Sequence, residues 1–214
     1  MSDLASKIDH TILKAETTAE DVRRICDEAK QFGFAAVCVP PVFVSLAASE
    51  LDGTEVKVCT VIGFPMGYSD TESKVIEAQV AIDDGAQELD MVIHIGALII
   101  GDKRGVRDDI EEVKQVCKRE GIVLKVILET GVLTPGQIEL ACDILNDVGV
   151  DFAKTSTGFN GGGASVEAVK LLRSKLNSDI RIKASGGIGT TEFAEELIAA
   201  GADRIGASKS TDLI

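Results

Sequence analysis

Short runs of β-branched and apolar residues alternate along the chain with longer stretches in which apolar residues recur every three or four positions. The short runs are typical of strands, and the longer stretches are typical of amphipathic helices. The predicted strands cover residues 8–12, 35–39, 57–64, 88–93, 123–129, 152–157, 181–185 and 204–207. The pattern therefore predicts eight strands that alternate with about seven helices.

Residues with strong preferences for helix ends mark the boundaries of the helical stretches. Thr18, Asp70, Thr134 and Thr190 each precede an apolar periodic segment, and Pro135 occupies a first-turn position. A residue that adopts the left-handed conformation at low cost follows each predicted helix: Gly33, Gly53, Gly85, Gly121, Gly149, Asn177 and Gly201. These positions predict seven helix ends.

Strict alternation of strands and helices indicates parallel β-α units, and eight strands favour a closed (β/α)8 TIM barrel formed by a single domain, residues 1–214. An open doubly wound sheet is the alternative, but no G-x-G-x-x-G segment follows the first predicted strand. Residues 208–214 are too few for a full helix after the last strand. We expect that end of the barrel to be incomplete or covered by another subunit, and the sequence leaves both open.

Charged residues occupy alternate positions in four of the predicted strands. If the sheet closes, Asp90, Lys125, Lys154 and Lys183 all face the barrel interior. Active sites of such barrels lie at the C-terminal ends of the strands, where these side chains converge. Three lysines cannot all be neutralised by one or two carboxylates, so a purely structural cluster of ion pairs is the weaker interpretation.

Two neighbouring lysines and an aspartate suit covalent chemistry on a carbonyl group. A lysine attacks a carbonyl only when its amine is unprotonated, and a second cation disfavours the ammonium form. Lys183 can activate Lys154 in this way, while Asp90 and an ammonium group move protons. This is metal-independent aldolase chemistry. For Asp9 and Glu129 we expect a role in orienting a lysine.

Glycine-rich segments follow the last three predicted strands. Gly158 lies after the sixth strand, Gly186 and Gly187 follow the seventh, and Ser208 with Lys209 follows the eighth. Backbone N–H groups of such loops and of the helix that follows suit an anion, and loops after strands seven and eight commonly bind phosphate in this fold. Most glycine residues in loops are explained by turns alone. The prediction of a phosphate site therefore depends on the position of these residues, directly after the last three strands.

Composition excludes several other classes of protein. The formal net charge of −13 disfavours nucleic acid and anionic membranes as partners. The chain lacks both a signal-like N-terminus and the roughly 18 apolar residues of a membrane span, so we expect a cytoplasmic protein.

Five scattered cysteines fit reduced core thiols. The two histidines, His10 and His94, have no ligand spacing, so we expect neither a metal nor another cofactor.

Several motifs in this order resemble one known family, the deoxyribose-phosphate aldolases, which are class I (Schiff-base) aldolases. The resemblance covers nearly the whole chain and extends through residues 8–14, 37–39, 61–67, 88–93, 125–130, 154–158, 183–188 and 204–208. It implies that Lys154 forms the Schiff base and that Asp90 and Lys183 transfer protons. It further implies supporting polar roles for Asp9 and Lys125.

The same resemblance implies reversible cleavage of 2-deoxy-D-ribose 5-phosphate to D-glyceraldehyde 3-phosphate and acetaldehyde. Gly186, Gly187 and Ser208 would then lie near the phosphate. The short segment after the last strand motivates a further hypothesis, that the chain forms a homodimer or a larger homo-oligomer.

Three departures from the family pattern affect the expected substrate preference more than the reaction type. Pro40 and His94 stand where asparagine is common in the family, and Lys209 stands where a small residue is usual. Two rival functions remain: a different Schiff-base lyase or transaldolase-like enzyme, which use of acetaldehyde would distinguish, and a non-catalytic sugar-phosphate-binding protein. A binding protein has no need of Asp90 together with Lys183.

Overall fold

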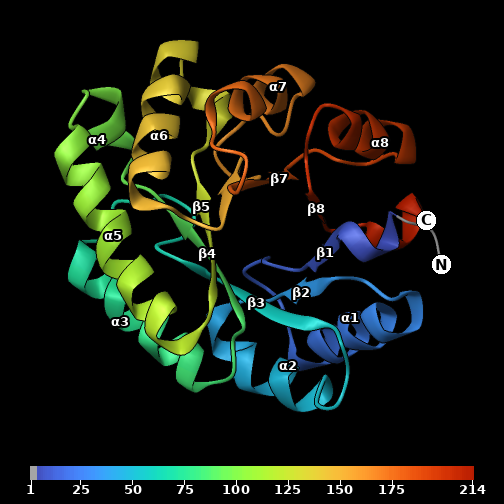
Figure 1. Ribbon diagram of the computed structural model, residues 1–214. Helices are drawn as coiled ribbons and strands as arrows, with labels where there is room; N and C mark the ends of the chain where they lie inside the picture. The colour runs from blue at the N-terminus through green and yellow to red at the C-terminus, as the bar shows by residue number, and fades with distance from the viewer. Residues whose placement is uncertain (1–3) are drawn as a thin grey trace.

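The computed structural model describes residues 4–214 and contains a closed barrel of eight parallel strands in the order β1-β2-β3-β4-β5-β6-β7-β8. Residues 1–3 of the predicted domain lie outside the described residues. The strands form a ring surrounded by helices, and the first and last strands lie side by side (Figure 1). Their bounds are β1 (Ile8–Thr11), β2 (Ala36–Cys38), β3 (Lys57–Ile62), β4 (Glu88–Val92), β5 (Val123–Ile127), β6 (Phe152–Lys154), β7 (Arg181–Ser185) and β8 (Arg204–Ala207). The predicted TIM barrel is confirmed.

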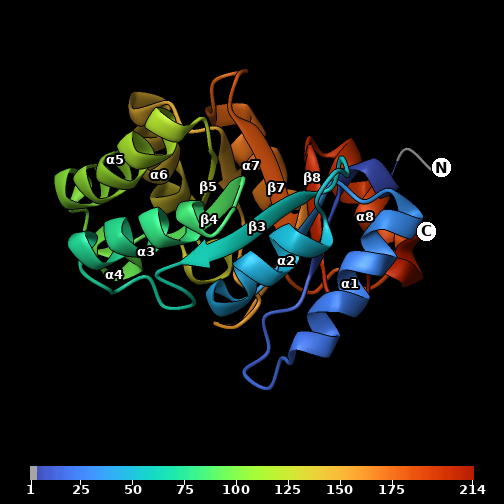
Figure 2. The ribbon, with the colours of Figure 1, turned by 90° about the horizontal axis from the view of Figure 1, so that it is seen from below.

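The helices connect successive strands and cover the outside of the barrel (Figures 1 and 2). They are α1 (Ala19–Phe32), α2 (Val44–Glu50), α3 (Thr71–Asp83), α4 (Ile95–Ile99), α5 (Lys103–Glu120), α6 (Pro135–Val148), α7 (Val166–Lys175) and α8 (Thr191–Ala199). Short 3-10 segments are η1 (Ala5–Lys7), η2 (Pro41–Phe43), η3 (Thr130–Val132) and η4 (Ser210–Leu213). The sequence pattern did not separate α4, a single short helix between β4 and α5, from the helix that follows it.

Capping residues explain where the helices begin. The side chains of Thr18 and Thr134 each accept a hydrogen bond from the N–H of the third residue of the following helix, and the side chain of that residue accepts one from the threonine N–H. Asp70 and Thr190 cap α3 and α8 as expected. These contacts satisfy N–H groups that have no partner inside the helix.

The predicted helix ends are confirmed for some of the glycines and wrong for Asn177. Gly33, Gly121 and Gly149 end α1, α5 and α6 in the left-handed conformation. Asn177 does not adopt this conformation, since Glu129 is the one residue other than glycine with a positive φ among residues 4–214. Helix α7 instead ends at the extended Leu176, where the Arg173 guanidinium binds the carbonyl oxygen.

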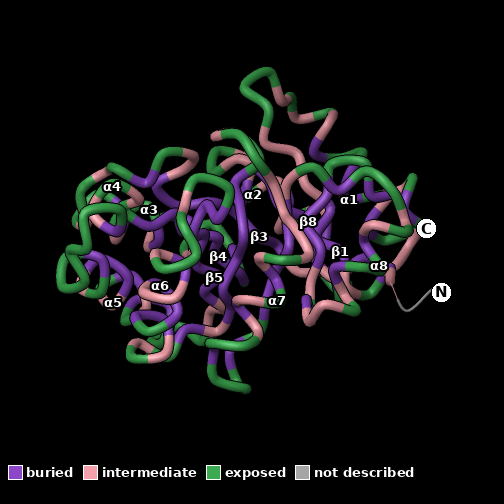
Figure 3. The backbone as a smooth tube through the Cα atoms, turned by 90° about the horizontal axis from the view of Figure 1, so that it is seen from above, coloured by how far each residue is buried: buried purple, intermediate pink, exposed green. Residues whose placement is uncertain are grey.

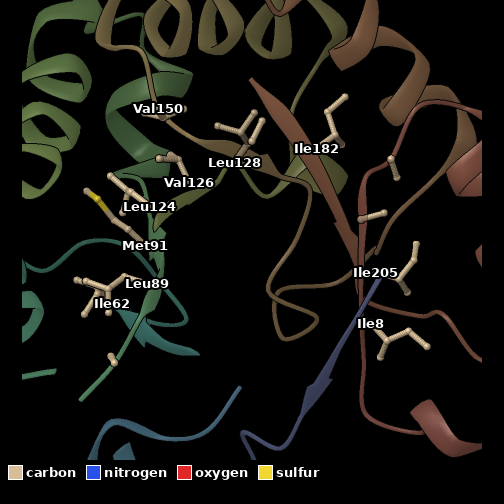
Figure 4. Close-up of a cluster of buried hydrophobic side chains, with 14 of the residues drawn as sticks. Ile8, Ile62, Leu89, Met91, Leu124, Val126, Leu128, Val150, Ile182 and Ile205 are labelled. Carbon is tan, nitrogen blue, oxygen red and sulfur yellow. The ribbon is translucent and has the colours of Figure 1, made fainter. Parts of the chain in front are cut away.

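Outward-facing apolar side chains of the strands form the main core between the barrel and the helices. Ile62, Leu89, Met91, Leu124 and Val126 pack side by side on neighbouring strands (Figure 4). Each is fully shielded from solvent, and burying a side chain of this size stabilises the fold by about 1.5–3 kcal/mol. Buried positions follow the strands and the inner faces of the helices, and exposed positions follow the outer helix faces and loops (Figure 3).

As expected, no full helix follows the last strand within residues 208–214, and the sheet nevertheless closes. Strand β8 pairs with β1, so the ring of hydrogen bonds closes. The short η4 segment lies against β1 and α8, and its Leu213 is fully buried. The start of the described chain, at η1, and the C-terminal η4 lie on the same side of the barrel (Figure 1).

Two further expectations concern membrane segments and cysteines. Within residues 4–214, no helix combines the length and the apolar character that crossing a membrane requires. All five cysteines are buried free thiols. Burial raises the pKa of the Cys26 thiol to about 11 and that of Cys117 to about 12, so these thiols stay protonated near neutral pH.

Candidate active site

Asp90 lies at the centre of a polar cluster inside the barrel. Its Oδ2 atom accepts hydrogen bonds from Lys154 Nζ and Lys183 Nζ, each at 2.7 Å, and its Oδ1 atom accepts one from Lys125 Nζ at 2.8 Å. The four side chains come from β4, β5, β6 and β7, and Lys154 pairs in register with Lys183. The predicted convergence of Asp90 with the three lysines is therefore observed.

Asp9 extends the cluster to β1 and β8. One carboxylate oxygen accepts a hydrogen bond from Lys183 Nζ, and the other accepts one from the Arg204 guanidinium. Asp9 is fully buried, and Arg204 is also in cation–π contact with the Phe152 ring at 5.8 Å. The expectation that Asp9 orients a lysine is consistent with this contact to Lys183.

Three residues of the cluster, Glu88, Cys59 and Arg204, were not singled out from the sequence. Glu88 lies 2.6 Å from Lys125 Nζ and 3.2 Å from Arg204, so it links β4 to β5 and β8. Cys59 donates a hydrogen bond to Asp90 Oδ1 at 3.2 Å. The strand alternation that revealed the lysines also places Glu88 and Arg204 inward, so the same argument applied to both strands would have found them.

Electrostatic coupling fixes the charges of most of these groups. Burial alone raises the pKa of Asp90, but Lys125, Lys154 and Lys183 together hold it well below its usual range. Burial opposes the charge of Lys183 as well, but Asp9 and Asp90 raise the pKa of its amine above the ordinary value. Asp90 is therefore a carboxylate and Lys183 an ammonium group at neutral pH.

Glu129 does not orient a lysine, contrary to expectation. It lies just after β5 in the left-handed region (φ 61°), which turns its buried carboxylate toward the loop after β6. There it accepts hydrogen bonds from the Thr157 hydroxyl at 2.5 Å and from Asn160 Nδ2 at 3.0 Å. Asn160 also donates to the Pro65 carbonyl oxygen. Glu129 thus fastens the loop that follows Lys154 to the loops after β3 and β5.

The predicted phosphate residues lie in loops after β6, β7 and β8. Gly158, Gly186 and Gly187 have φ values of 84°, 89° and 75°, which glycine adopts without strain. A Cβ atom on Gly186 would lie 3.3 Å from the Gly158 Cα atom, so these two loops touch through their backbones. Ser208 and Lys209 are exposed after β8, which pairs with β7.

Acidic and thiol groups inside the barrel also satisfy the spacing of a metal site. The ligand atoms of Cys38, Cys59 and Asp90 lie within 4.8 Å of one another. However, the two oxygens of Asp90 accept hydrogen bonds from Lys125 and Lys183, and the positive charge of these groups opposes a metal cation. His94 is exposed and caps α4 by accepting from the Ala97 N–H. We therefore assign no metal to these residues.

Comparisons with known proteins agree with this geometry. The sequence pattern of the DeoC/LacD family of aldolases matches residues 4–209. A deoxyribose-phosphate aldolase from Bacillus cereus strain AH820 is 51% identical over 212 residues, which cover 99% of this chain and 95% of that protein. A Bacillus anthracis protein of the same name matches equally well.

A solved structure provides the corresponding comparison of folds. The structure described as a unique tetrameric deoxyribose phosphate aldolase from Aeropyrum pernix superposes with a TM-score of 0.93 at 36% identity. The match covers 99% of this chain and 89% of that one. Sequence and fold therefore agree over nearly the full length: the chain belongs to the DeoC/LacD family of aldolases and, within it, to the deoxyribose-phosphate aldolases.

Proposed function

We propose that this aldolase cleaves 2-deoxy-D-ribose 5-phosphate through a Schiff base on Lys154, with Asp90 and Lys183 as the proton-transfer pair. The observation that carries the proposal is the shared contact at Asp90 Oδ2, where both lysine amines lie at 2.7 Å. A nucleophilic amine, a carboxylate and an ammonium group then stand within one hydrogen-bond network.

Charge balance within the cluster supports a neutral amine. The cluster contains three carboxylates: Asp9, Glu88 and Asp90. They contact four basic side chains: Lys125, Lys154, Lys183 and Arg204. An unmatched buried charge is expensive, and arginine does not lose its proton. Among residues 4–214, Lys183 and Lys125 each form ion pairs with at least two carboxylates, whereas Lys154 forms one only with the shared Asp90. We therefore assign Lys154 as the neutral nucleophile.

The reaction begins when Lys154 Nζ attacks C1 of the open-chain sugar. Loss of the carbonyl oxygen as water gives an iminium ion, which withdraws electrons from the neighbouring C2–C3 bond. Removal of the C3 hydroxyl proton breaks that bond, so C3 becomes the aldehyde carbon of D-glyceraldehyde 3-phosphate and the electron pair forms an enamine. Protonation of C2 followed by addition of water releases acetaldehyde and restores the amine.

Asp90 and Lys183 have the charge states that these proton transfers require. The lysines hold the pKa of Asp90 low, so Asp90 is a carboxylate and is free to accept a proton. Asp9 and Asp90 raise the pKa of Lys183, so Lys183 is an ammonium group and has a proton to donate. Lys125 and Asp9 act as supporting residues because each contacts a member of this pair. Positioned proton-transfer groups of this kind contribute about 10²–10⁴-fold to a rate.

We assign the 5-phosphate to the loops after β6, β7 and β8. Gly158, Gly186 and Gly187 leave backbone N–H groups without a covering Cβ atom, and Ser208 and Lys209 are open to solvent. The N-terminus of α8 also follows the β7 loop and favours an anion. Lys209 adds one positive charge to an otherwise acidic protein.

The experiment that tests the function is an assay of acetaldehyde released from 2-deoxy-D-ribose 5-phosphate, run in parallel with its unphosphorylated analogue. We expect turnover of the phosphorylated sugar, loss of turnover in Lys154→Met, and use of acetaldehyde as donor in the reverse direction. A transaldolase-like enzyme would instead reject acetaldehyde as donor. A binding protein would show saturable binding of the sugar phosphate without any release of acetaldehyde.

Three broader assignments accompany this function. We propose that residues 1–214 form one domain and that the chain assembles as a homo-oligomer. Exposed apolar side chains, Val42, Ile76 and Val80, support the assembly, as does the tetrameric relative from Aeropyrum pernix. Light scattering that gives a monomeric mass would contradict it. Five free cysteines fit a reducing compartment, which supports a cytoplasmic location.

A further inference from the structure

His10 occupies the opposite face of β1 from the catalytic cluster. Its neighbour Asp9 points into the barrel toward Lys183, so His10 points outward, between the barrel and the layer that surrounds it. The His10 ring is 2% exposed and packs edge-on against Phe34, with ring centroids 5.2 Å apart. Nothing in the aldol reaction uses this side chain.

Both ring nitrogens of His10 have side-chain partners on different elements. Nε2 lies 2.6 Å from Glu28 Oε2 in α1, and Nδ1 lies 2.9 Å from Ser210 Oγ in η4. Arg24 holds the other oxygen of Glu28 at 2.9 Å. Burial lowers the pKa of His10, and Nε2–H donates to the Glu28 carboxylate. The ring therefore ties η4 to α1.

Ser210 joins this contact to the turn that follows β8. Its hydroxyl is fully buried and also lies 3.0 Å from the carbonyl oxygen of Ala207, the last residue of β8. The two residues between them, Ser208 and Lys209, are exposed. The His10–Ser210 contact therefore fixes the base of a turn whose exposed part is the assigned phosphate loop.

A second contact fixes the far end of the same segment. Thr191 Oγ1 in α8 donates to the Leu213 carbonyl oxygen at 3.1 Å, and Leu213 is fully buried. With Leu213 anchored on α8 and Ser210 anchored on His10, the turn that carries Ser208 and Lys209 has little freedom to move.

We propose that His10 is a positioning residue for the phosphate end of the substrate: backed by Glu28, it holds Ser210 so that the Ser208–Lys209 turn keeps one conformation for the anion. The proposal rests on the proposed function, because it assigns the phosphate to this turn. It predicts a selective effect, since a turn that binds only phosphate contributes nothing to a substrate without one.

Three substitutions of His10 test the contacts of its two ring nitrogens separately. In His10→Asn the amide reaches the position of Nδ1 and keeps a partner for Ser210. In His10→Gln the amide reaches the position of Nε2 and keeps a partner for Glu28. His10→Phe keeps the volume of the ring but has no hydrogen-bonding atom for either partner. We expect His10→Phe and His10→Gln to raise KM for 2-deoxy-D-ribose 5-phosphate about tenfold, with kcat nearly unchanged; about tenfold corresponds to one lost contact of 1.4 kcal/mol. His10→Asn keeps a KM near that of the native chain.

Unphosphorylated 2-deoxyribose is the internal control for all three variants. We expect kcat/KM for this sugar to stay constant in every variant, and we expect Ser210→Ala, a small change that removes the hydroxyl, to reproduce the effect of His10→Phe. Equal losses with both sugars, or a KM increase in His10→Asn as large as in His10→Phe, would overturn the positioning role. If the native chain forms no borohydride-stable adduct with acetaldehyde, the proposed function fails independently of His10.

Discussion

Lys154 and Lys183 share a single oxygen atom, Asp90 Oδ2, which lies 2.7 Å from each amine. The two lysines are also direct neighbours in the register of β6 and β7. This arrangement keeps the Lys183 ammonium group beside the nucleophile. Asp90 is thus the residue on which both the charge balance and the proton transfer depend.

Replacement of Asp90 by asparagine should therefore lower activity strongly. We expect Asp90→Asn to lower kcat by about 10²–10⁴-fold, because it removes the proton acceptor between the two amines. Steady-state kinetics of acetaldehyde release measure this effect.

Asp109→Asn is the matched control, since it removes the partner of another buried lysine. Lys74 Nζ lies 2.6 Å from Asp109 Oδ2, and both side chains are almost fully buried between α3 and α5. Breaking such a pair costs about 3–5 kcal/mol of stability, which thermal unfolding would detect. A fall in kcat as large as that of Asp90→Asn would show that loss of a buried charge, and not proton transfer, explains both.

Glu129→Gln should loosen the loop after β6. The amide oxygen can still accept from the Thr157 hydroxyl and Asn160, which both bind Oε2, but the amide NH2 group then replaces Oε1, which accepts from the Thr157 N–H at 3.2 Å. We therefore expect a loss of about 1–3 kcal/mol in the free energy of unfolding. Hydrogen exchange of residues 157–163 should become faster, while exchange in β1 stays the same. Unchanged exchange in that loop would contradict the fastening role of Glu129.

Lys209→Gln should weaken binding of the phosphorylated substrate. The side chain is exposed, so its contribution to phosphate binding is screened by salt, and we expect a several-fold increase in KM at low ionic strength that shrinks as salt is added. Lys118→Gln, which changes an exposed lysine on α5, is the control for net charge. Equal effects of the two substitutions would remove Lys209 from the phosphate site.

The pH dependence of stability should carry a contribution from His10. Burial lowers its pKa below 6.5, with Glu28 opposing and Arg24 assisting the shift. As pH falls through 6.5 the unfolded chain therefore binds a proton that the folded chain does not, so stability decreases on acidification in this interval. We expect denaturant unfolding to show a smaller loss for His10→Asn than for the native chain between about pH 7 and about pH 5.5. Identical slopes would contradict this assignment.

A second loss of stability should follow at lower pH. Burial raises the pKa of Asp9, but Lys183, Lys125 and Arg204 together hold it well below 3.8. The unfolded chain takes up a proton near 3.8 while folded Asp9 stays charged, so this contribution is present above that pH and is lost as pH falls through it. Asp9→Asn should be less stable at pH 7 and should lose less stability on further acidification.

Much of the site was predictable because it depends on strand periodicity. Alternation along β4 to β7 places Asp90, Lys125, Lys154 and Lys183 on one face, and closure of the barrel brings that face together. Short-range preferences likewise predicted the caps at Thr18 and Thr134. These features depend on local sequence or on one global property, the closed sheet.

The remaining features depend on contacts between distant residues or on unusual backbone geometry. His10 and Ser210 are separated by 200 positions, and neither residue type by itself indicates the other. Glu129 follows the strand pattern in sequence, but its positive φ turns the carboxylate away from the lysines. A non-glycine residue adopts that conformation only where tertiary contacts compensate, which a periodic pattern does not report.

The most direct test of the central claim is borohydride reduction in the presence of acetaldehyde or 2-deoxy-D-ribose 5-phosphate, followed by peptide mass spectrometry. We predict one stable adduct, on Lys154, that depends on substrate and disappears in Lys154→Met. An adduct on Lys183 or Lys125 in the native chain would contradict the assigned roles while leaving an aldolase, and the absence of an adduct on any lysine would contradict Schiff-base catalysis by this barrel.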